Sequence, residues 1–193
     1  PVLELVTSPN NPDGHTRARS VSAGPHTHLV MDHAYLWPHF TAVGAPAPVE
    51  YGNDTVALFT LSKMTGHAST RIGWALVADA RVAARMRHFL EMLTLGVPRE
   101  SQLRAISALE HVVAHDGEIF RYARQLMAGR WATLEAILPP GGAGGFHLEP
   151  REAAAPRDAF TGTADYAPTP AYAWIELRDP TRFGGDATVA MRS

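Results

Sequence analysis

The chain has 193 residues, of which 46% are hydrophobic and 19% are charged. This balance can supply a packed core, so we expect a folded protein of one domain or slightly more. The formal net charge of −2 at pH 7 argues against a strongly basic nucleic-acid surface and against attraction to an anionic membrane. Cysteine is absent, which excludes disulfides, thiolate metal sites and cysteine nucleophiles from this chain.

The sequence shows no sign of membrane insertion or targeting. No run approaches about 18 uninterrupted apolar residues, the length that a membrane span requires. The chain begins with Pro1, and no signal or transit segment can be read there. We therefore expect a cytoplasmic protein that binds neither membranes nor nucleic acids.

The first 78 residues are predicted to be rich in strands. Short apolar runs of strand length, each ended by polar or turn-forming residues, cover 2–6, 28–31, 55–61 and 72–77. The first run is followed by Pro, Asn, Asp and Gly residues over 8–14, which favour a tight turn. Ligands of α/β sheets bind at the carboxyl ends of the strands, so the polar residues there are candidates for a site.

From Asp79 onward the apolar residues follow helical spacing. The three helical patterns run over 82–93, 103–113 and 119–138. Asp79 is predicted to be the N-cap of the first helix, and the residues at 96–98 are predicted to separate it from the second. Three helices in succession mark a change from the strand-rich start of the chain.

The last part of the chain is predicted to be small and irregular. A Gly- and Pro-rich loop occupies 139–145, residues 149–170 are expected to be irregular, and 172–177 alternate as a strand. We expect two units, with 1–95 an α/β domain and 96–193 a helical linker followed by a small α+β domain.

Lys63 is singled out by the basic composition. Of the 17 basic residues, 16 are arginine and only this one is lysine. Arginine cannot replace an amine that must lose its proton in order to react. Lys63 is therefore a candidate for amine chemistry.

Seven polar residues of unlike chemistry lie near the ends of the predicted strands: Asn11, Asp32, Tyr35, Thr60, Ser62, Lys63 and Arg71. A lysine amine can form a Schiff base with an aldehyde, and a carboxylate can keep a pyridine nitrogen protonated. Asparagine and tyrosine can bind a phenolic oxygen, while hydroxyls and arginine can bind a phosphate dianion. Pyridoxal phosphate has all four of these features, so it is the cofactor that this set predicts.

Three segments in this order resemble the signature of fold-type I aminotransferases: 8–14, 32–35 and 60–74. More narrowly, 35–40 and 62–68 resemble the alliinase and tryptophan aminotransferase-related family, and the likeness continues at 95–104, 130–131 and 170–174. Tyrosine three residues after Asp32 and arginine eight residues after Lys63 make the combination specific. The resemblance implies an α/β fold, the PLP-dependent transferase fold type I, with a mostly parallel sheet.

The resemblance also implies roles for individual residues. Lys63 matches the lysine that is joined covalently to the cofactor, and Asp32 matches the partner of the pyridine nitrogen. The other two pairs of matches concern the rest of the cofactor. Asn11 and Tyr35 match the ligands of the phenolic oxygen. Thr60 and Arg71 match ligands of the phosphate, and Ser62 is a further phosphate ligand.

Arg192 is the residue expected to bind the carboxylate of the substrate. It follows a Phe-Gly pair at 183–184, as the corresponding arginine does in the family that the chain resembles. Family members also carry a long N-terminal section with a glycine-containing phosphate loop and an aromatic residue that stacks on the cofactor. Neither is visible in this chain, so we expect a partial member, and a homodimer for the full-length protein.

Three functions are compatible with this resemblance. The first is a tryptophan aminotransferase-related activity, which converts L-tryptophan and a 2-oxo acid to indole-3-pyruvate in auxin synthesis. The second is an alliinase-type carbon–sulfur lyase, and the third is an inactive truncated member. The expected partners are small molecules, namely an amino acid and a 2-oxo acid. No metal site is expected, because the histidines at 26, 28, 33 and 39 lack a recognisable ligand spacing.

Overall fold

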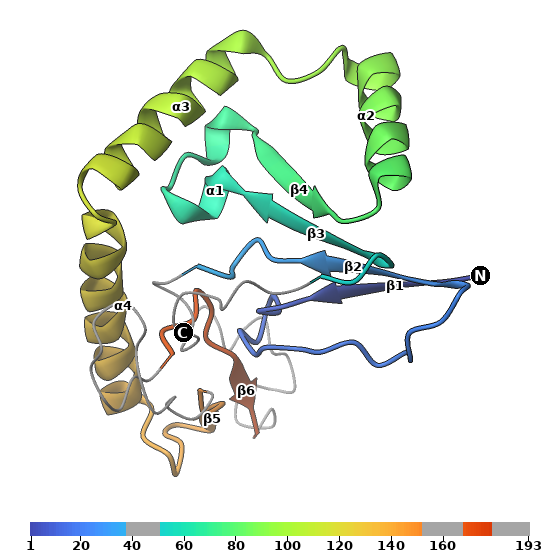
Figure 1. Ribbon diagram of the computed structural model, residues 1–193. Helices are drawn as coiled ribbons and strands as arrows, with labels where there is room; N and C mark the ends of the chain where they lie inside the picture. The colour runs from blue at the N-terminus through green and yellow to red at the C-terminus, as the bar shows by residue number, and fades with distance from the viewer. Residues whose placement is uncertain (38–50, 152–167, 179–193) are drawn as a thin grey trace.

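The computed structural model describes residues 1–37, 51–151 and 168–178. Four strands form the larger sheet in the order in which they occur along the chain. These strands are β1 (Val2–Thr7), β2 (Thr27–Asp32), β3 (Thr55–Thr60) and β4 (Gly73–Val77). The first three are parallel, and β4 is antiparallel to β3 (Figure 1). The carboxyl ends of β1, β2 and β3 therefore meet at one edge of the sheet.

A short helix follows β3 directly, where the sequence pattern had suggested that the strand continues through Leu61. Helix α1 covers Leu61–Met64, and its N-cap Thr60 accepts a hydrogen bond from the backbone N–H of Ser62. The cap turns the chain out of the sheet one residue earlier than the apolar run predicts. A 3-10 turn, η1 (Ala68–Thr70), leads on to β4.

Three long helices follow the sheet: α2 (Ala80–Thr94), α3 (Arg99–Ala114) and α4 (Glu118–Ile137). The predicted N-cap of α2 is confirmed, because the Asp79 carboxylate accepts hydrogen bonds from the backbone N–H groups of Arg81 and Val82. Figure 1 shows α2 beside the sheet, α3 crossing away from it and α4 leading toward the C-terminal strands. No helix among the described residues is long and apolar enough to cross a membrane.

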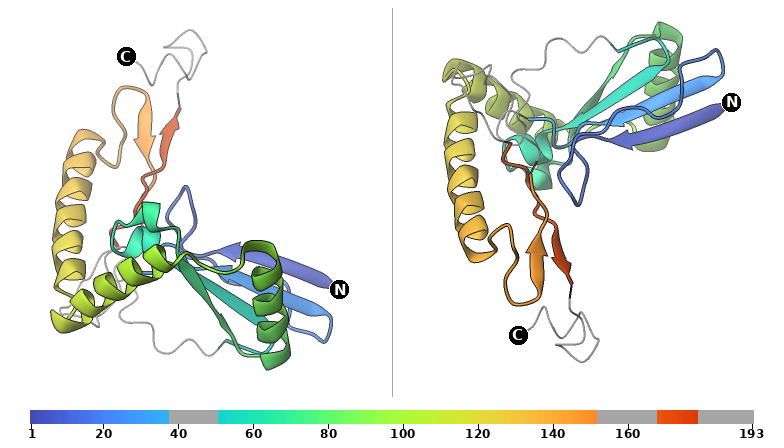
Figure 2. Two further views of the ribbon diagram at one scale, coloured as in Figure 1. Left: turned by 90° about the horizontal axis from the view of Figure 1, so that it is seen from above. Right: turned by 90° about the horizontal axis from the view of Figure 1, so that it is seen from below.

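Two short strands, β5 (Phe146–Leu148) and β6 (Ile175–Leu177), form a separate antiparallel pair. Figure 2 shows this pair extending away from the larger sheet. The expected strand at 172–177 is therefore only three residues long, and β5 was not expected at all. Because β5 is short and pairs with a strand far along the chain, it has no strong local signal of its own.

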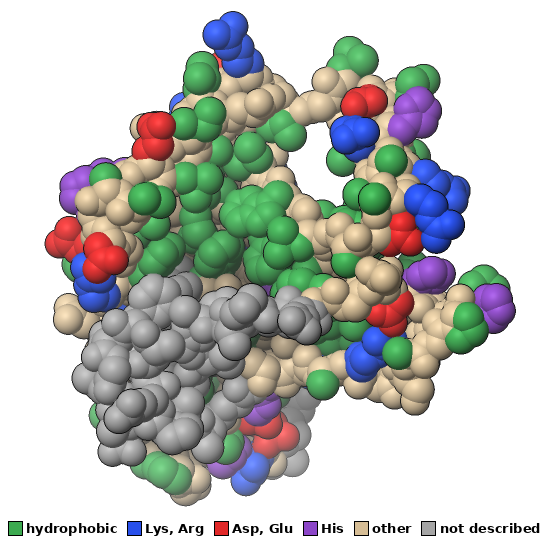
Figure 3. Space-filling model, in the orientation of Figure 1, with side chains coloured by type: hydrophobic (Ala, Val, Ile, Leu, Met, Phe, Trp, Pro, Cys, Tyr) green, Lys and Arg blue, Asp and Glu red, His purple; other side chains and the backbone are tan. Residues whose placement is uncertain are grey.

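A hydrophobic core cluster among the described residues holds α1 in place. Leu61 and Met64 of α1 are buried against Ala105 of α3 and Phe120 of α4. In Figure 3 hydrophobic side chains gather on the face between α3 and the sheet. In contrast, α2 has no buried residue. The helix that bears Lys63 is thus anchored on both sides of that lysine.

We expect Leu61→Ala to lower the free energy of unfolding by about 2–5 kcal/mol, because Leu→Ala in a packed core loses contacts and leaves a cavity. Leu61 is only 1% exposed. Urea unfolding followed by circular dichroism measures the change. The matched control is Leu93→Ala, at a residue that is 66% exposed, for which a change below about 1 kcal/mol is expected. Equal losses in the two variants would contradict this assignment of the core.

Candidate functional site

The end of β2 lies between its two parallel neighbours. Asp32, the last residue of β2, is in register with Thr7 of β1 and Leu58 of β3. Its Oδ1 accepts a hydrogen bond of 3.0 Å from the backbone N–H of Ala34, and the residue is partly buried. The carboxylate therefore starts the turn that leads to Tyr35 while it stands at the carboxyl edge of the sheet.

Lys63 lies beside Tyr35 at this edge. The Lys63 Nζ atom is 5.6 Å from the centroid of the Tyr35 ring. Tyr35 is buried, whereas Lys63 is exposed. A cation near the face of an aromatic ring is attracted to it. The Tyr35 ring belongs to the segment that follows β2, where it is buried. The structure thus brings together two residues that are separated by the whole of β3.

Asn11 is connected to Tyr35 through Tyr172, a residue for which the sequence predicts no role. The Asn11 side-chain amide donates a hydrogen bond of 3.1 Å to the hydroxyl of Tyr172. The Tyr172 hydroxyl is also hydrogen-bonded to the hydroxyl of Tyr35, and the two rings pack edge to face with centroids 4.9 Å apart. The signal for Tyr172 was its place in the family-like segment 170–174, but no chemistry of its own set it apart.

Burial raises the pKa of Tyr172 to about 12, and the hydrogen bond with Tyr35 acts in the same direction. The positive charge of Lys63 opposes this shift. Tyr172 therefore keeps its hydroxyl hydrogen throughout the physiological range of pH.

The three predicted phosphate ligands lie around α1 and η1. The Thr60 hydroxyl donates to the backbone carbonyl of Ile72 at 3.2 Å as well as capping α1. Ser62 lies in the first turn of α1, and the Arg71 guanidinium donates to the carbonyl of Ala68 at 3.0 Å. Arg71 is exposed and has a left-handed backbone, with φ 53. The segment from α1 to β4 thus returns Arg71 to the same edge of the sheet as Thr60. Arg192 lies outside the described residues.

His33, next to Asp32, is buried within this edge. Its Nδ1 is 2.7 Å from the carbonyl oxygen of Ser8, and its ring packs against Tyr51 and Phe59. Burial lowers the pKa of His33 below its ordinary value of 6.5, while the bond to Ser8 and the charge of Asp32 oppose the shift. The carbonyl can only accept, so Nδ1 carries the hydrogen.

The lowered pKa of His33 predicts a pH dependence of stability. Between the folded pKa and about pH 6.5 the unfolded chain binds more protons at this residue than the folded one, so acid favours unfolding. We expect the stability lost between about pH 7.5 and about pH 5.5 to be smaller in His33→Gln than in the unmodified protein. Urea unfolding at both pH values measures it, with His28→Gln as the control at an exposed histidine. The same loss in all three proteins would contradict the prediction.

The site has the donor set of a small anionic aromatic ligand. The Lys63 amine, the Asp32 carboxylate, the Tyr35 phenol and the Asn11 amide lie at one edge of the sheet. The hydroxyl groups of Thr60 and Ser62 and the Arg71 guanidinium lie around α1 and η1. These groups fit a ring that carries an aldehyde, a basic nitrogen, a phenolic oxygen and a phosphate. Within the described ranges no group of three or more histidine, aspartate or glutamate side chains could hold a metal ion.

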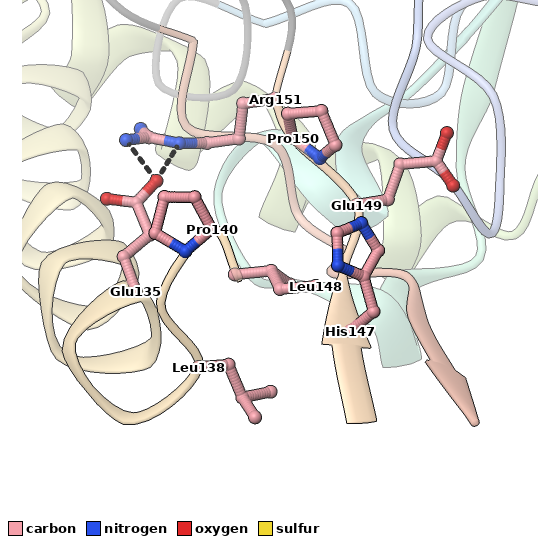
Figure 4. A pocket seen from close by; sticks show the side chains of 8 residues that line it. All are labelled: Glu135, Leu138, Pro140, His147, Leu148, Glu149, Pro150 and Arg151. Carbon is pink, nitrogen blue, oxygen red and sulfur yellow. Dashed lines mark hydrogen bonds and ion pairs between the residues drawn. The ribbon is translucent and has the colours of Figure 1, made fainter. Parts of the chain in front are cut away.

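A separate cavity of about 470 Å³ lies between the end of α4 and β5 (Figure 4). The Arg151–Glu135 ion pair, at 2.7 Å, forms part of its wall, and the Arg151 guanidinium lies 5.0 Å from the centroid of the Trp131 ring. None of the predicted site residues lines this cavity. These contacts give Arg151 a structural role at the end of α4.

Comparison with known proteins gives matches over most of the chain. The Allinase family model matches residues 1–188. Tryptophan aminotransferase-related protein 3 of Arabidopsis thaliana is 37% identical over 185 residues, which cover 93% of this chain and 37% of that protein. Alliin lyase 1 of Allium sativum is 33% identical over 184 residues, which cover 90% of this chain and 35% of that protein. The chain therefore spans little more than a third of the length of these relatives.

A solved structure shows the same fold. A PLP-dependent aminotransferase from Streptococcus suis superposes with a TM-score of 0.59 at 18% sequence identity, over 75% of this chain and 38% of that one. At this identity the match concerns the fold alone. It confirms the α/β architecture of PLP-dependent transferase fold type I that the sequence predicts.

Proposed function

Because this chain belongs to the alliinase family, we propose that it carries the lysine-bearing part of a pyridoxal-phosphate-dependent enzyme that acts as an aminotransferase on an L-amino acid. The observation that carries the proposal is the meeting of Asn11, Tyr35 and Lys63 at the carboxyl edge of three parallel strands. The three residues come from separate segments of the chain, and the fold brings them to one place.

Lys63 has two tasks in this proposal. Its amine would hold the cofactor at the aldehyde carbon, and as a free amine it would move a proton at the α-carbon of the substrate. When bound, pyridoxal phosphate supplies an electron sink for the negative charge that proton removal leaves on that carbon. Asp32 keeps the ring nitrogen protonated, which is the condition for that sink.

The other residues hold and orient the cofactor. Asn11 and Tyr35 donate hydrogen bonds to its phenolic oxygen, and Arg71 binds its phosphate. Thr60 and Ser62 also bind the phosphate, and for Thr60 this means that its hydroxyl hydrogen turns away from the carbonyl of Ile72. Arg192 binds the carboxylate of the substrate.

The proposed substrate is L-tryptophan, with a 2-oxo acid such as pyruvate as the amino acceptor. The support is the identity of 37% with a protein named as tryptophan aminotransferase-related. The product would be indole-3-pyruvate, in auxin synthesis. We also propose a homodimer, as fold-type I enzymes typically share their sites between two subunits.

The test is to incubate the purified protein, loaded with pyridoxal phosphate, with L-tryptophan and pyruvate. We expect indole-3-pyruvate and alanine in equal amounts, and no reaction when pyruvate is omitted. A carbon–sulfur lyase, the activity named for the Allium sativum relative, would instead release pyruvate from an S-alkyl cysteine sulfoxide without any acceptor. Cofactor binding with neither reaction would favour an inactive member of the family.

A further inference from the structure

Tyr172 has contacts at the site that the proposed roles leave unexplained. It lies just before β6, far along the chain from the strands of the larger sheet, yet its hydroxyl reaches both Asn11 and Tyr35. Its ring stands edge to face against the Tyr35 ring at an interplanar angle of 68°. Packing of the ring alone would be served equally by phenylalanine, so the two hydroxyl contacts need a separate reason.

The chemistry of the two partners determines the direction of the hydrogen bonds. The amide nitrogen of Asn11 is a donor only, so the Tyr172 oxygen accepts in that contact. Within the described part of the chain, the Tyr172 hydroxyl makes hydrogen bonds to Asn11 and Tyr35. The oxygen of Tyr35 is therefore the acceptor available to the Tyr172 hydrogen. The order of donation runs from Asn11 to Tyr172 and from Tyr172 to Tyr35.

This order affects what Tyr35 can do. When Tyr35 accepts the bond from Tyr172, its own hydrogen is not used in that contact and can be donated in another direction. A hydroxyl that accepts a hydrogen bond also becomes a stronger donor, because successive hydrogen bonds polarise one another. The Tyr172 hydroxyl stays protonated across the working range, since its pKa is raised to about 12.

We propose that Tyr172 is a positioning residue, which donates its hydroxyl hydrogen to Tyr35 and so directs the Tyr35 hydrogen toward the phenolic oxygen of the cofactor. The destination of that hydrogen rests on the proposed function, whereas the bond between the two tyrosines does not. The segment before β6 thereby contributes to the site through Tyr35 rather than by touching the cofactor itself.

The experiment compares Tyr172→Phe with the control Tyr122→Phe, which removes the same hydroxyl from a residue of α4 that is 65% exposed. In the cofactor-loaded proteins, the pH midpoint of the absorbance change of bound pyridoxal phosphate is measured. We expect the midpoint to rise by about one pH unit in Tyr172→Phe, because a weaker donor at Tyr35 stabilises the phenolate less. Tyr122→Phe should leave it unchanged.

A second measurement needs no cofactor. In protein labelled at the tyrosine Cζ carbons, Tyr172→Phe keeps the neighbouring ring but removes its hydroxyl, so the Cζ resonance of Tyr35 should shift, while Tyr122→Phe should not move it. If Tyr172→Phe does not fold, Tyr35→Phe gives the reciprocal reading at the Tyr172 Cζ.

The outcomes separate this proposal from the proposed function. An unmoved Tyr35 resonance overturns the hydrogen bond, and a shifted resonance with an unchanged midpoint overturns the positioning role. If the unmodified protein binds no pyridoxal phosphate at Lys63, the proposed function fails and, with it, the destination assigned to the Tyr35 hydrogen. The resonance measurement still decides whether the hydroxyls of Tyr172 and Tyr35 are hydrogen-bonded to each other.

Discussion

Replacing Lys63 with alanine should abolish covalent attachment of pyridoxal phosphate. The chain has no other lysine, and only an amine can form the bond to the aldehyde. After reduction with borohydride, mass spectrometry of the unmodified protein should place the adduct on the peptide that contains Lys63. The same treatment of Lys63→Ala should give no adduct on any internal peptide, and the visible absorbance of the bound cofactor should be lost.

Lys63→Arg is the control that separates amine chemistry from charge. Arginine keeps a cation beside the Tyr35 ring, where the Lys63 Nζ lies 5.6 Å from the centroid, but its guanidinium cannot act as the nucleophile. We expect it to lose the adduct as completely as alanine does. An adduct that persists in either variant would show that Lys63 is not the attachment point.

Asp32→Asn should reduce the turnover number for transamination by about 10²–10³-fold while the protein stays folded and binds the cofactor. The expected cause is the loss of the negative charge that keeps the ring nitrogen protonated, an electrostatic effect of the size seen when one preorganised group is removed. Steady-state kinetics with L-tryptophan and pyruvate, together with the absorbance of the bound cofactor, measure the two quantities separately.

The substitution also distinguishes this role from a purely structural one. Asp32 Oδ1 accepts the backbone N–H of Ala34, and an asparagine oxygen can accept the same bond. Asp32→Ala removes both the charge and the acceptor, so it should lower stability as well as turnover. If Asp32→Asn keeps full turnover and only Asp32→Ala is impaired, the carboxylate serves the turn and not the chemistry.

The gathering of site residues could be predicted because it follows from local signals and one topological rule. Asn11, Asp32 and Lys63 each follow an apolar run within a few residues, and parallel strands bring such positions to one edge. The start of α2 was also readable, since Asp79 precedes a helical pattern and its side chain satisfies the first free N–H groups.

The features that could not be predicted depend on distant contacts or on very short elements. Helix α1 has four residues, too few to show a helical period. The three-residue strand β5 exists through pairing with the distant β6, and Tyr172 reaches Tyr35 across 137 positions of sequence. Sequence periodicity reports local structure, so contacts of this kind leave little trace in it.

Helix α2 shows a different limit of periodicity. Its apolar spacing correctly predicts a helix, but Phe89 is 63% exposed and Met92 is 75% exposed. The spacing of apolar residues describes which side of a helix is hydrophobic and says nothing about what lies against that side. For α3 and α4 the partner is visible, because Ala105 and Phe120 pack against α1.

The antiparallel return of β4 beside β3 has a consequence for length variation. Gly73 is in register with Thr60, and a Cβ at Gly73 would collide with the backbone oxygen of Phe59. One residue inserted between Lys63 and Arg71 would have to bulge out or slide β4 along β3, which would turn its side chains to the opposite face. The length of the segment 64–70 thus fixes the separation of the Lys63 amine and the Arg71 guanidinium. This segment should accept changes of residue type far more readily than insertions or deletions.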